Sequence, residues 1–157
     1  MLRIKISRIN KWKKKGYTIG VANGCFDMLH PGHKKLIKEA KKISDKLIIL
    51  LNSDESVKKL KGKNRPIENI TIRKKKLNSL KEVDEIITFK EKTPLKIIKK
   101  IKPNYLFKGN EYKINQISGK NFLKKTDAKI ILIRMYKKYS TTQLIKINKI
   151  NDSKIYK

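Results

Sequence analysis

The stretch that decides the fold runs from Asn23 to His33 and reads N-G-C-F-D-M-L-H-P-G-H. An apolar run at residues 17–22 precedes it and predicts a buried strand, and residues 34–43 follow it with apolar side chains on one helical face. Pro31 suits the first turn of a helix, where its missing N–H costs nothing. The helix that begins here therefore presents free backbone N–H groups and the positive end of its dipole, which favour an anion.

Both histidines of the chain, His30 and His33, stand at the opening of this helix. Gly24 allows a sharp turn or a close approach to a ligand, and Gly32 lies between the histidines, where it lets a phosphate come near the backbone. A single histidine at such a place would more often cap the helix or pack against it. Two histidines around a glycine at a strand-to-helix junction favour phosphate binding instead.

This eleven-residue motif resembles the nucleotide-binding motif of the cytidylyltransferase-like nucleotidyltransferases, a variant of the H-x-G-H element that class I aminoacyl-tRNA synthetases share. The four-residue element alone is weakly specific, but the longer form directly after a strand is specific. The chain is too short for a synthetase and has no K-M-S-K-S-like loop. The resemblance implies that His30 and His33 are the catalytic residues and donate hydrogen bonds to phosphate oxygens of a nucleoside triphosphate.

The chain has 157 residues, which is enough for one domain with a proper core. We expect a single domain over 1–157, with its core at about 14–150 and with 1–13 as a basic N-terminal extension or a short helix. Its one cysteine, Cys25, excludes a disulfide framework and a zinc cluster. The sequence shows no signal peptide and no membrane span, so a cytoplasmic protein is the default expectation.

The formal net charge is +29, from 42 basic and 13 acidic residues, and it predicts non-specific attraction to polyanions. The lysines are spread over nearly every segment, and no aromatic stacking motif of an RNA-binding sheet accompanies them. This distribution favours a compositional bias toward Lys, Ile and Asn over specific nucleic-acid binding. We therefore expect small-molecule partners and no specific nucleic acid, with the charge helping to bind phosphates, and the sequence leaves a homodimer open.

Four further apolar runs predict strands at 46–51, 83–89, 105–107 and 130–133. Helices are predicted at 55–60, at 70–80, after Thr93-Pro94, and at 141–150 after Ser140. Strands that alternate with helices indicate a parallel sheet with right-handed crossovers. We expect an α/β fold, a single Rossmann-like, doubly wound, parallel five-stranded sheet of order 3-2-1-4-5 with helices on both faces. Ligands bind such sheets at the carboxyl ends of the strands, where four loops converge here: the H-P-G-H junction, 61–66, 108–112 and 140–142.

Three segments narrow the resemblance: N-S-D-E-S-V-K-K-L-K-G-K-N-R-P, then K-G-N-E-Y, then S-T-T-Q-L-I. In this order, between Lys14 and Ile150, they resemble the adenylyltransferase domain that makes ADP-heptose and forms one half of a bifunctional bacterial enzyme. The resemblance implies transfer from ATP to D-glycero-β-D-manno-heptose 1-phosphate, release of pyrophosphate, and Mg²⁺ carried mainly by the ATP phosphates. The product would feed lipopolysaccharide core biosynthesis. No kinase half accompanies the motifs, so we expect a stand-alone form.

The resemblance and the residue chemistry together supply the candidate site. The nucleotide-binding candidates are Asn23, Gly24, Phe26, His30, Gly32, His33, Gly109, Glu111, Ser140, Thr141 and Thr142. The candidates for a phosphate or sugar-phosphate clamp are Lys61, Arg65, Arg73 and Lys108, although a solvated basic loop or a surface helix residue explains several of them equally well. Asp27 either binds magnesium or orders its loop, and no metal ligand is assigned. Cys25 is interpreted as a packing residue, because no acid–base pair accompanies it.

Four residues in three segments depart from the family pattern. Asn110 and Glu111 replace the second glycine and the aspartate of K-G-G-D-Y, Lys138 replaces a glycine before S-T-T, and Ser44 replaces a glycine after the first motif's helix. The first two put the nucleoside contact in question, whereas the H-P-G-H core is intact. A glycerol-3-phosphate cytidylyltransferase, or a related enzyme, is the alternative within the same class. A basic nucleic-acid-binding protein is the alternative from a different class.

Overall fold

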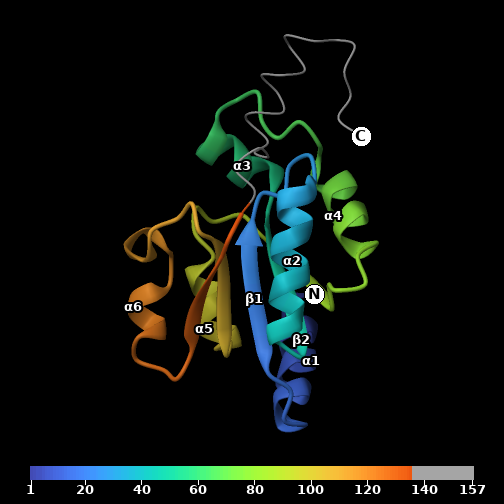
Figure 1. Cartoon of the computed structure of the whole chain (residues 1–157). Helices are drawn as coiled ribbons and strands as arrows, with labels where there is room; N and C mark the ends of the chain where they lie inside the picture. The colour runs from blue at the N-terminus through green and yellow to red at the C-terminus, as the bar shows by residue number, and fades with distance from the viewer. Residues whose placement is uncertain (136–157) are drawn as a thin grey trace.

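The computed structural model describes residues 1–135, and Figure 1 shows the arrangement of their elements. In chain order they are α1 (Leu2–Lys14), β1 (Ile19–Gly24), α2 (Pro31–Ile43), β2 (Lys46–Asn52), α3 (Asp54–Lys61), α4 (Ile70–Asn78), β3 (Glu85–Phe89), α5 (Leu95–Ile101), β4 (Tyr105–Gly109), η1 (Ile114–Gln116), α6 (Lys120–Leu123) and β5 (Lys129–Ile133). The predicted closing helix at 141–150 lies outside the described residues.

The five strands form one parallel sheet of order β3-β2-β1-β4-β5, which confirms the predicted topology. β1 is central, and its Val21 pairs with Ile48 of β2 on one side and with Leu106 of β4 on the other. The strand order reverses between β1 and β4, and the chains that leave these two strands pack on opposite faces of the sheet. Open α/β sheets bind ligands in the crevice at such a reversal.

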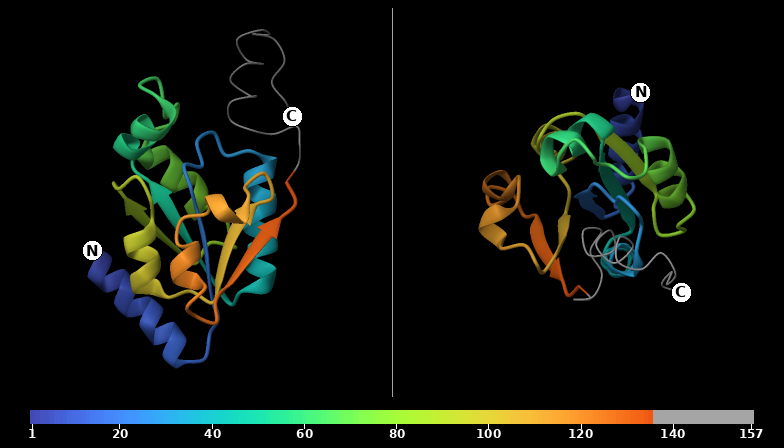
Figure 2. Two further views of the ribbon diagram at one scale, coloured as in Figure 1. Left: turned by 90° about the vertical axis from the view of Figure 1, so that its left-hand side faces the viewer. Right: turned by 90° about the horizontal axis from the view of Figure 1, so that it is seen from above.

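Alternate residues of each central strand enter two separate apolar clusters, one on each face of the sheet. Val21, Ile48 and Leu50 belong to the cluster that α1 and α5 cover, and Ala22 and Ile49 belong to the cluster that α2 and α4 cover. Figure 2 shows helices on both faces. Strands buried on both faces read as continuous apolar runs, which explains why K-L-I-I-L-L was recognisable as a strand.

The first helix packs against the apolar core, although the expected domain core began at about residue 14. Ile9 of α1 is fully buried in the cluster that also contains α5. Lys5 and Arg8 form ion pairs of 2.8 and 2.7 Å with Glu85, which is only 8% exposed at the start of β3. Lys13 donates to the carbonyl of Lys102 just after α5, at 2.6 Å. The sequence left open whether residues 1–13 form a basic extension or a short helix, and the structure shows a helix there.

Ser44, which stands where the family pattern has a glycine, is accommodated by a glycine on the neighbouring strand. A Cβ at Gly20 would lie 2.4 Å from the Ser44 hydroxyl oxygen and 2.6 Å from the Phe107 ring. The Ser44 hydroxyl donates to the Ala40 carbonyl at 2.9 Å and so is satisfied inside the core. The departure at Ser44 therefore concerns core packing, because the serine side chain fills the space beside Gly20 at the base of the sheet, away from the carboxyl edge.

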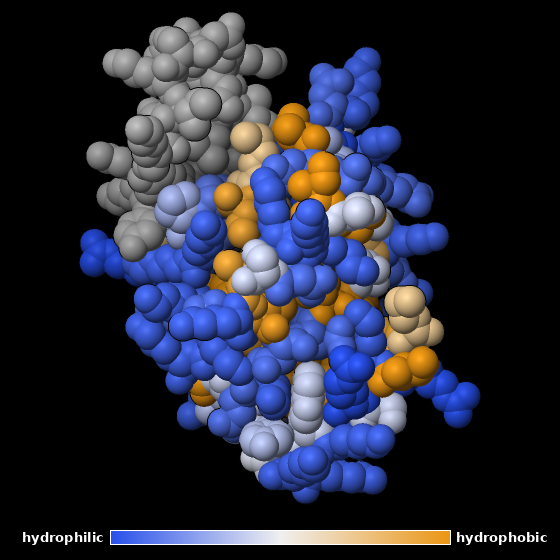
Figure 3. Space-filling view, turned by 90° about the vertical axis from the view of Figure 1, so that its right-hand side faces the viewer, coloured by the Kyte–Doolittle hydropathy of each residue, from blue (hydrophilic) through white to orange (hydrophobic). Residues whose placement is uncertain are grey.

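The surface matches the dispersed charge of the sequence. The face seen in Figure 3 is mostly hydrophilic, with scattered apolar side chains rather than one continuous apolar patch. Between residues 1 and 135, no helix is both long and apolar enough to cross a membrane.

Candidate active site

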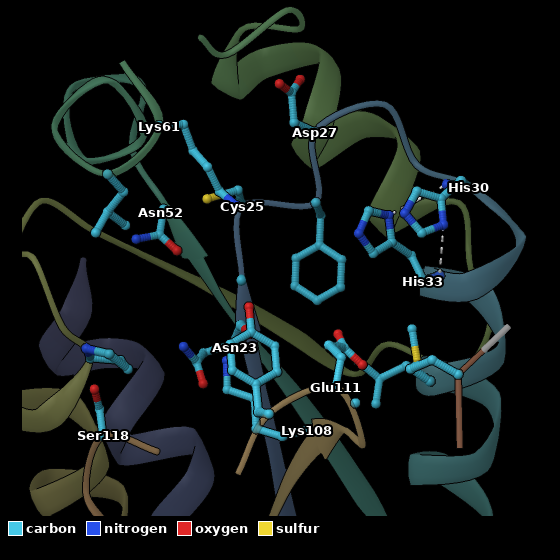
Figure 4. Close-up of a pocket in the computed structure, with 18 of the residues that line it drawn as sticks. Asn23, Cys25, Asp27, His30, His33, Asn52, Lys61, Lys108, Glu111 and Ser118 are labelled. Atoms are coloured by element: carbon cyan, nitrogen blue, oxygen red, sulfur yellow. Dashed lines mark hydrogen bonds between the residues drawn. The ribbon is translucent and has the colours of Figure 1, made fainter. Parts of the chain in front are cut away.

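A cavity of about 1180 Å³ opens at the carboxyl edge of the sheet. Its lining comes from the ends of β1, β2 and β4, from the start of α2, from the end of α3 and from the chain that leaves β5. Figure 4 shows the two histidines on one side of this space and Lys61 and Asn52 on the other, with Lys108 and Asn23 below them. Segments that are far apart in the sequence therefore meet at the topological switch point.

His30 and His33 cap helix α2 reciprocally. The Nδ1 atom of His30 accepts the backbone N–H of His33 at 3.3 Å, and Nδ1 of His33 accepts the backbone N–H of His30 at 3.4 Å. The two rings stack with centroids 3.6 Å apart and planes at 19°. Because each Nδ1 is an acceptor, the proton of each neutral ring is on Nε2. The capping box thus leaves two parallel Nε2–H donors.

Burial, together with a smaller contribution from the neighbouring His30, lowers the pKa of His33 to about 3. Burial also lowers the pKa of His30. Both imidazoles are therefore neutral near pH 7, and each offers one hydrogen-bond donor without carrying a charge. The positive end of the α2 dipole lies directly behind them, so this corner favours anionic oxygens without a resident cation.

The structure explains why residue 32 is a glycine, and this explanation was not apparent from the sequence. A Cβ on this residue would lie 2.9 Å from Cε1 and 3.0 Å from Nδ1 of His30. The space beside its Cα is thus occupied by the His30 ring, whereas the sequence suggested room for a phosphate. The glycine allows the imidazole to lie flat against the first turn of α2 and stack on His33.

The loop before the histidines contains two non-glycine residues with left-handed backbone conformations. Phe26 has φ 46° and Met28 has φ 54°. Phe26 is buried, and its ring lies 5.2 Å from that of His33, so the strained turn places an aromatic face beside the catalytic candidate. Such conformations persist where the surroundings fix them, as they do at many functional sites.

Asp27 orders the basic loop. Its Oδ2 accepts hydrogen bonds from Arg65 Nε at 2.8 Å and from the Ile67 N–H at 2.9 Å, and its Oδ1 accepts the Glu68 N–H at 2.9 Å. Burial raises the pKa of this carboxyl, but the three donors outweigh burial and hold the pKa below its usual range. Of the two roles left open by the sequence, these contacts support loop ordering.

A magnesium site built from protein ligands does not fit these contacts. Both oxygens of Asp27 already accept protein donors, and no group of three His, Cys, Asp or Glu side chains suited to a metal occurs within the described part of the chain. A Mg²⁺ ion that arrives on nucleotide phosphates needs no such group, because it keeps phosphate and water ligands.

Arg73, which the sequence offered as a candidate for the phosphate clamp, is buried and bonded to protein groups. It is 1% exposed. Its guanidinium donates to the carbonyls of Glu68, Cys25 and Asn52 at 2.9, 2.7 and 2.8 Å, and to the Asp54 carboxylate at 2.6 Å. These partners belong to four different segments around the cavity. Arg73 therefore fixes the cavity wall, and these contacts use four of its five N–H donors.

Two clamp candidates do line the cavity on its α3 side. Lys61 is exposed at the end of α3, and Arg65 has a side chain that is 12% exposed. Arg65 uses Nε for Asp27, whereas its two terminal nitrogens have no partner among residues 1–135. Arg65 can therefore present a fixed, two-pronged donor toward an anion.

The other wall is made by the residues that follow β4. Lys108 donates to the Asn23 carbonyl at 3.2 Å and lies 4.7 Å above the Tyr112 ring centroid. A Cβ on Gly109 would lie 2.1 Å from Oε2 of Glu111, so the glutamate folds back over the glycine. The predicted nucleotide contacts Gly109 and Glu111 are thus in mutual contact in the cavity wall, and Asn23, Gly24 and Phe26 also line it.

The comparisons with known proteins agree with this geometry. The family model described as cytidylyltransferase-like matches residues 21–147. The chain belongs to this family. Family membership and the histidine motif make it a nucleotidyltransferase enzyme.

Bacterial relatives and one solved structure support the same family, and a second solved structure supports the fold. The chain is 44% identical over 138 residues to the bifunctional protein HldE of Nitrobacter winogradskyi and 41% identical over 138 residues to that of Paramagnetospirillum magneticum. Each match covers 88% of this chain but 28% of the relative, so the chain spans little more than a quarter of these proteins. A lipopolysaccharide core biosynthesis protein of Thermoplasma volcanium superposes with a TM-score of 0.66 at 30% identity, covering 77% of this chain and 99% of the other. A pantoate–β-alanine ligase of Francisella tularensis shares the fold, with a TM-score of 0.59 at 20% identity over 92% of this chain and 75% of its own.

The departure from the family pattern at Asn110 has a structural consequence. Its backbone N–H donates to the Ile133 carbonyl at 2.9 Å, and its side-chain Oδ1 accepts the Met135 N–H at 3.0 Å. A glycine could make only the first of these bonds. Asn110 therefore ties the loop after β4 to the chain that leaves β5. Ser140, Thr141, Thr142 and Lys138 lie outside the described residues.

Several lining residues were not predicted from the sequence. They are Asn52, Lys92, Pro94, Ser118, Arg134 and Met135. Asn52, Lys92 and Arg134 stand at or just after strand ends, so the rule that ligands bind at carboxyl ends could have found them. Asn52 is buried, donates to the Ser56 hydroxyl at 2.9 Å and accepts from Arg73 through its carbonyl. Ser118 had no such signal, because the segment before it has no periodic pattern.

Proposed function

We propose that this nucleotidyltransferase transfers AMP from ATP to heptose 1-phosphate, forming ADP-heptose and releasing pyrophosphate. The observation that carries the proposal is the reciprocal cap of His30 and His33, which leaves two neutral Nε2–H donors side by side at a helix N-terminus. Such donors stabilise negative charge that develops on a phosphoryl group in a partly enclosed cavity.

The reaction requires positioning more than acid–base chemistry. An oxygen of the sugar phosphate attacks the α-phosphorus of ATP, the new O–P bond forms, and the bond to the β-phosphate breaks in line with it. The attacking oxygen is already anionic, so no strong base is needed. Pyrophosphate leaves with the electron pair of the broken bond. His30 and His33 would hold α- and β-phosphate oxygens, and Mg²⁺ carried by the phosphates would supply charge neutralisation.

Different parts of the cavity would contact different parts of the two substrates. Arg65 and Lys61 would clamp pyrophosphate or the sugar phosphate, because Arg65 is held by Asp27 and has two terminal nitrogens directed elsewhere. Gly109 and Glu111 would contact the nucleoside from the β4 side. Ser140, Thr141 and Thr142 would hold the β- and γ-phosphates, as the S-T-T motif of the family implies.

The choice of substrates rests on the second and third motifs and on the relatives. The N-R-P loop and K-G-N-E-Y resemble the heptose enzyme more than the cytidylyltransferases. The bifunctional relatives at 41–44% identity and the lipopolysaccharide core biosynthesis protein at 30% are consistent with this choice. The corresponding pathway is lipopolysaccharide core assembly, and a cytoplasmic location and a homodimer belong to the same proposal.

The test compares turnover of the four pairs formed by two nucleotides and two phosphorylated acceptors. The purified chain is incubated with ATP or CTP, and with heptose 1-phosphate or glycerol 3-phosphate, in the presence of Mg²⁺, and pyrophosphate release is measured. We expect the highest kcat/KM for ATP with heptose 1-phosphate, and His33→Ala provides the control for contaminating enzymes. Faster turnover of CTP with glycerol 3-phosphate would instead identify a cytidylyltransferase.

A further inference from the structure

Lys108 differs from the other lysines of the site in its surroundings. Ala22 of β1 pairs with Phe107 of β4, so Lys108 follows directly beside Asn23 where the two strands end. The ammonium lies at the bottom of the cavity beneath the histidines and Lys61 (Figure 4). Among the residues that the structure describes, Asn23 supplies its only hydrogen-bond acceptor, at 3.2 Å. An ammonium has three donors, so two of them have no protein acceptor there.

The charged groups around Lys108 do not supply a close counter-ion. Glu111 favours its charge and Lys61 opposes it, but no carboxylate oxygen in residues 1–135 lies within 4.0 Å of its nitrogen. The Tyr112 ring contributes a cation–π contact at 4.7 Å. The remaining neighbour is the Cys25 thiol, whose pKa is raised by burial and which is therefore uncharged near neutral pH. The ammonium is thus partly removed from water and under-compensated.

We propose that the Lys108 ammonium binds a phosphate group of one of the two substrates at the bottom of the cavity, and that the enzyme takes up a proton from solvent as this phosphate binds above neutral pH. The inference rests on the proposed function only in that both substrates carry phosphates. A neutral nucleobase or sugar hydroxyl would supply no charge to complete the site, whereas a phosphate oxygen would.

The proton balance follows from the environment. Burial lowers the pKa of Lys108 to about 8, so at about pH 8.5 most of the free enzyme holds a neutral amine. A bound phosphate is fully ionised at that pH and raises the pKa of the lysine, which then takes a proton from the buffer acid. The uptake should be roughly three quarters of a proton per site at pH 8.5 and near zero at pH 7.

The measurement is calorimetric titration at about pH 8.5 in two buffers with different ionisation enthalpies. Three ligands are titrated separately: a non-hydrolysable ATP analogue, heptose 1-phosphate and inorganic pyrophosphate. The difference in observed enthalpy between buffers gives the proton uptake for each ligand. The ligand that shows uptake identifies which phosphate Lys108 binds.

Three variants separate binding from structure. Lys108→Met should weaken that ligand about ten- to a hundredfold and abolish the uptake, as expected for one charge-assisted hydrogen bond. Lys108→Arg keeps a permanent charge, so it should retain binding within about tenfold and show no uptake. Lys92→Met removes the same charge from an exposed position on the same cavity and should retain the uptake.

Each outcome decides the proposal. It is overturned if no ligand gives proton uptake with the wild-type chain, or if Lys108→Met binds all three ligands normally. If Lys108→Met does not fold, the wild-type and Lys108→Arg titrations decide alone. Proton uptake without AMP transfer to any sugar phosphate would reject the proposed function and keep the role of Lys108. Formation of ADP-heptose without uptake would reject the role and keep the function.

Discussion

The two walls of the cavity are held in different ways. On the α3 side, the loop at residues 61–68 is fixed by charged groups, since Asp27 accepts three donors and Arg73 donates to four acceptors around it. On the β4 side, residues 108–112 have backbone pairing with β5, one hydrogen bond each from Lys108 and to Asn110, the Lys108–Tyr112 contact and a glutamate folded over a glycine. The first wall is preorganised by polar contacts, whereas the second has unsatisfied donors.

This difference corresponds to where the family pattern is kept. The histidine motif and the N-R-P loop are intact, and Asp27 of the motif accepts the hydrogen bonds that hold the loop on the α3 side. The departures Asn110 and Glu111 lie on the other wall, where Glu111 folds over Gly109 and Asn110 accepts a hydrogen bond from the Met135 N–H. Preorganised donors suit the conserved phosphate chemistry. The less constrained wall suits the part of a substrate that differs between family members.

The largest expected effect is on turnover when a histidine of the intact motif is removed. His33→Ala removes a donor aimed at charge that develops in the transition state, so kcat should fall by about 10²–10³ while substrate affinity changes much less. His30→Ala should behave similarly, and the double variant should lose less than the sum because both act on one phosphate group. Steady-state kinetics of the three variants measure this.

His33→Gln is the matched control, because glutamine at the third helical position can still accept the backbone N–H of His30 and complete the capping box. It should keep the thermal stability of the wild-type chain and still lose most of the turnover. Near-normal kcat in His33→Ala would show that the histidines only cap the helix.

The second effect is on stability. Arg73→Met leaves the carbonyls of Glu68, Cys25 and Asn52 without their donor, and should lower the free energy of unfolding by about 3 kcal/mol. Arg73→Lys keeps the charge but cannot reach four acceptors in one plane, so it should recover only part of the loss. Urea titration of both variants gives the values.

The opposite wall supplies the comparison for Arg73. Lys108→Met should not lower the free energy of unfolding, because the ammonium is under-compensated in the folded state. If Lys108→Met were as destabilising as Arg73→Met, the two walls would not differ in the way the contacts indicate.

These buried contacts mark the limit of what the sequence can predict. The order of the sheet followed from apolar runs that alternate with helical patterns, and the position of the site followed from His30 and His33 at a strand end. The role of Arg73 did not follow, because a helical arginine among lysines looks the same whether it faces solvent or four buried acceptors. Likewise, Gly32 suggested room for a phosphate, but whether a ligand or the His30 ring fills that room depends on side-chain rotamers.

Gly20 in the core and Gly109 on the β4 wall of the cavity should respond differently to an added methyl group. In Gly20→Ala the new Cβ meets the Ser44 hydroxyl and the Phe107 ring inside the core, so the loss should be about 2 kcal/mol. In Gly109→Ala it meets only the flexible end of Glu111, so stability should change by less than about 1 kcal/mol while KM for ATP rises.

Ser44→Gly on the Gly20→Ala background tests whether contact with Ser44 causes the loss of stability. Removing the hydroxymethyl group should restore part of the stability, and the Phe107 contact should keep the recovery incomplete. Thermal denaturation of the single and double variants measures the coupling. Additive effects would show that Ser44 and Gly20 do not share the same space.

The smallest effect is expected at Cys25, which lies between the two walls. Burial raises the pKa of its thiol despite Lys61, Arg73 and Arg65 nearby, so the group is a thiol rather than a thiolate near pH 7. Its contribution to the site is the backbone carbonyl that accepts from Arg73 at 2.7 Å, and an alanine keeps that carbonyl. Cys25→Ala should therefore keep kcat/KM within about threefold and lose about 1 kcal/mol of stability. Abolished turnover with an unchanged circular dichroism spectrum would show instead that the thiol takes part in the chemistry.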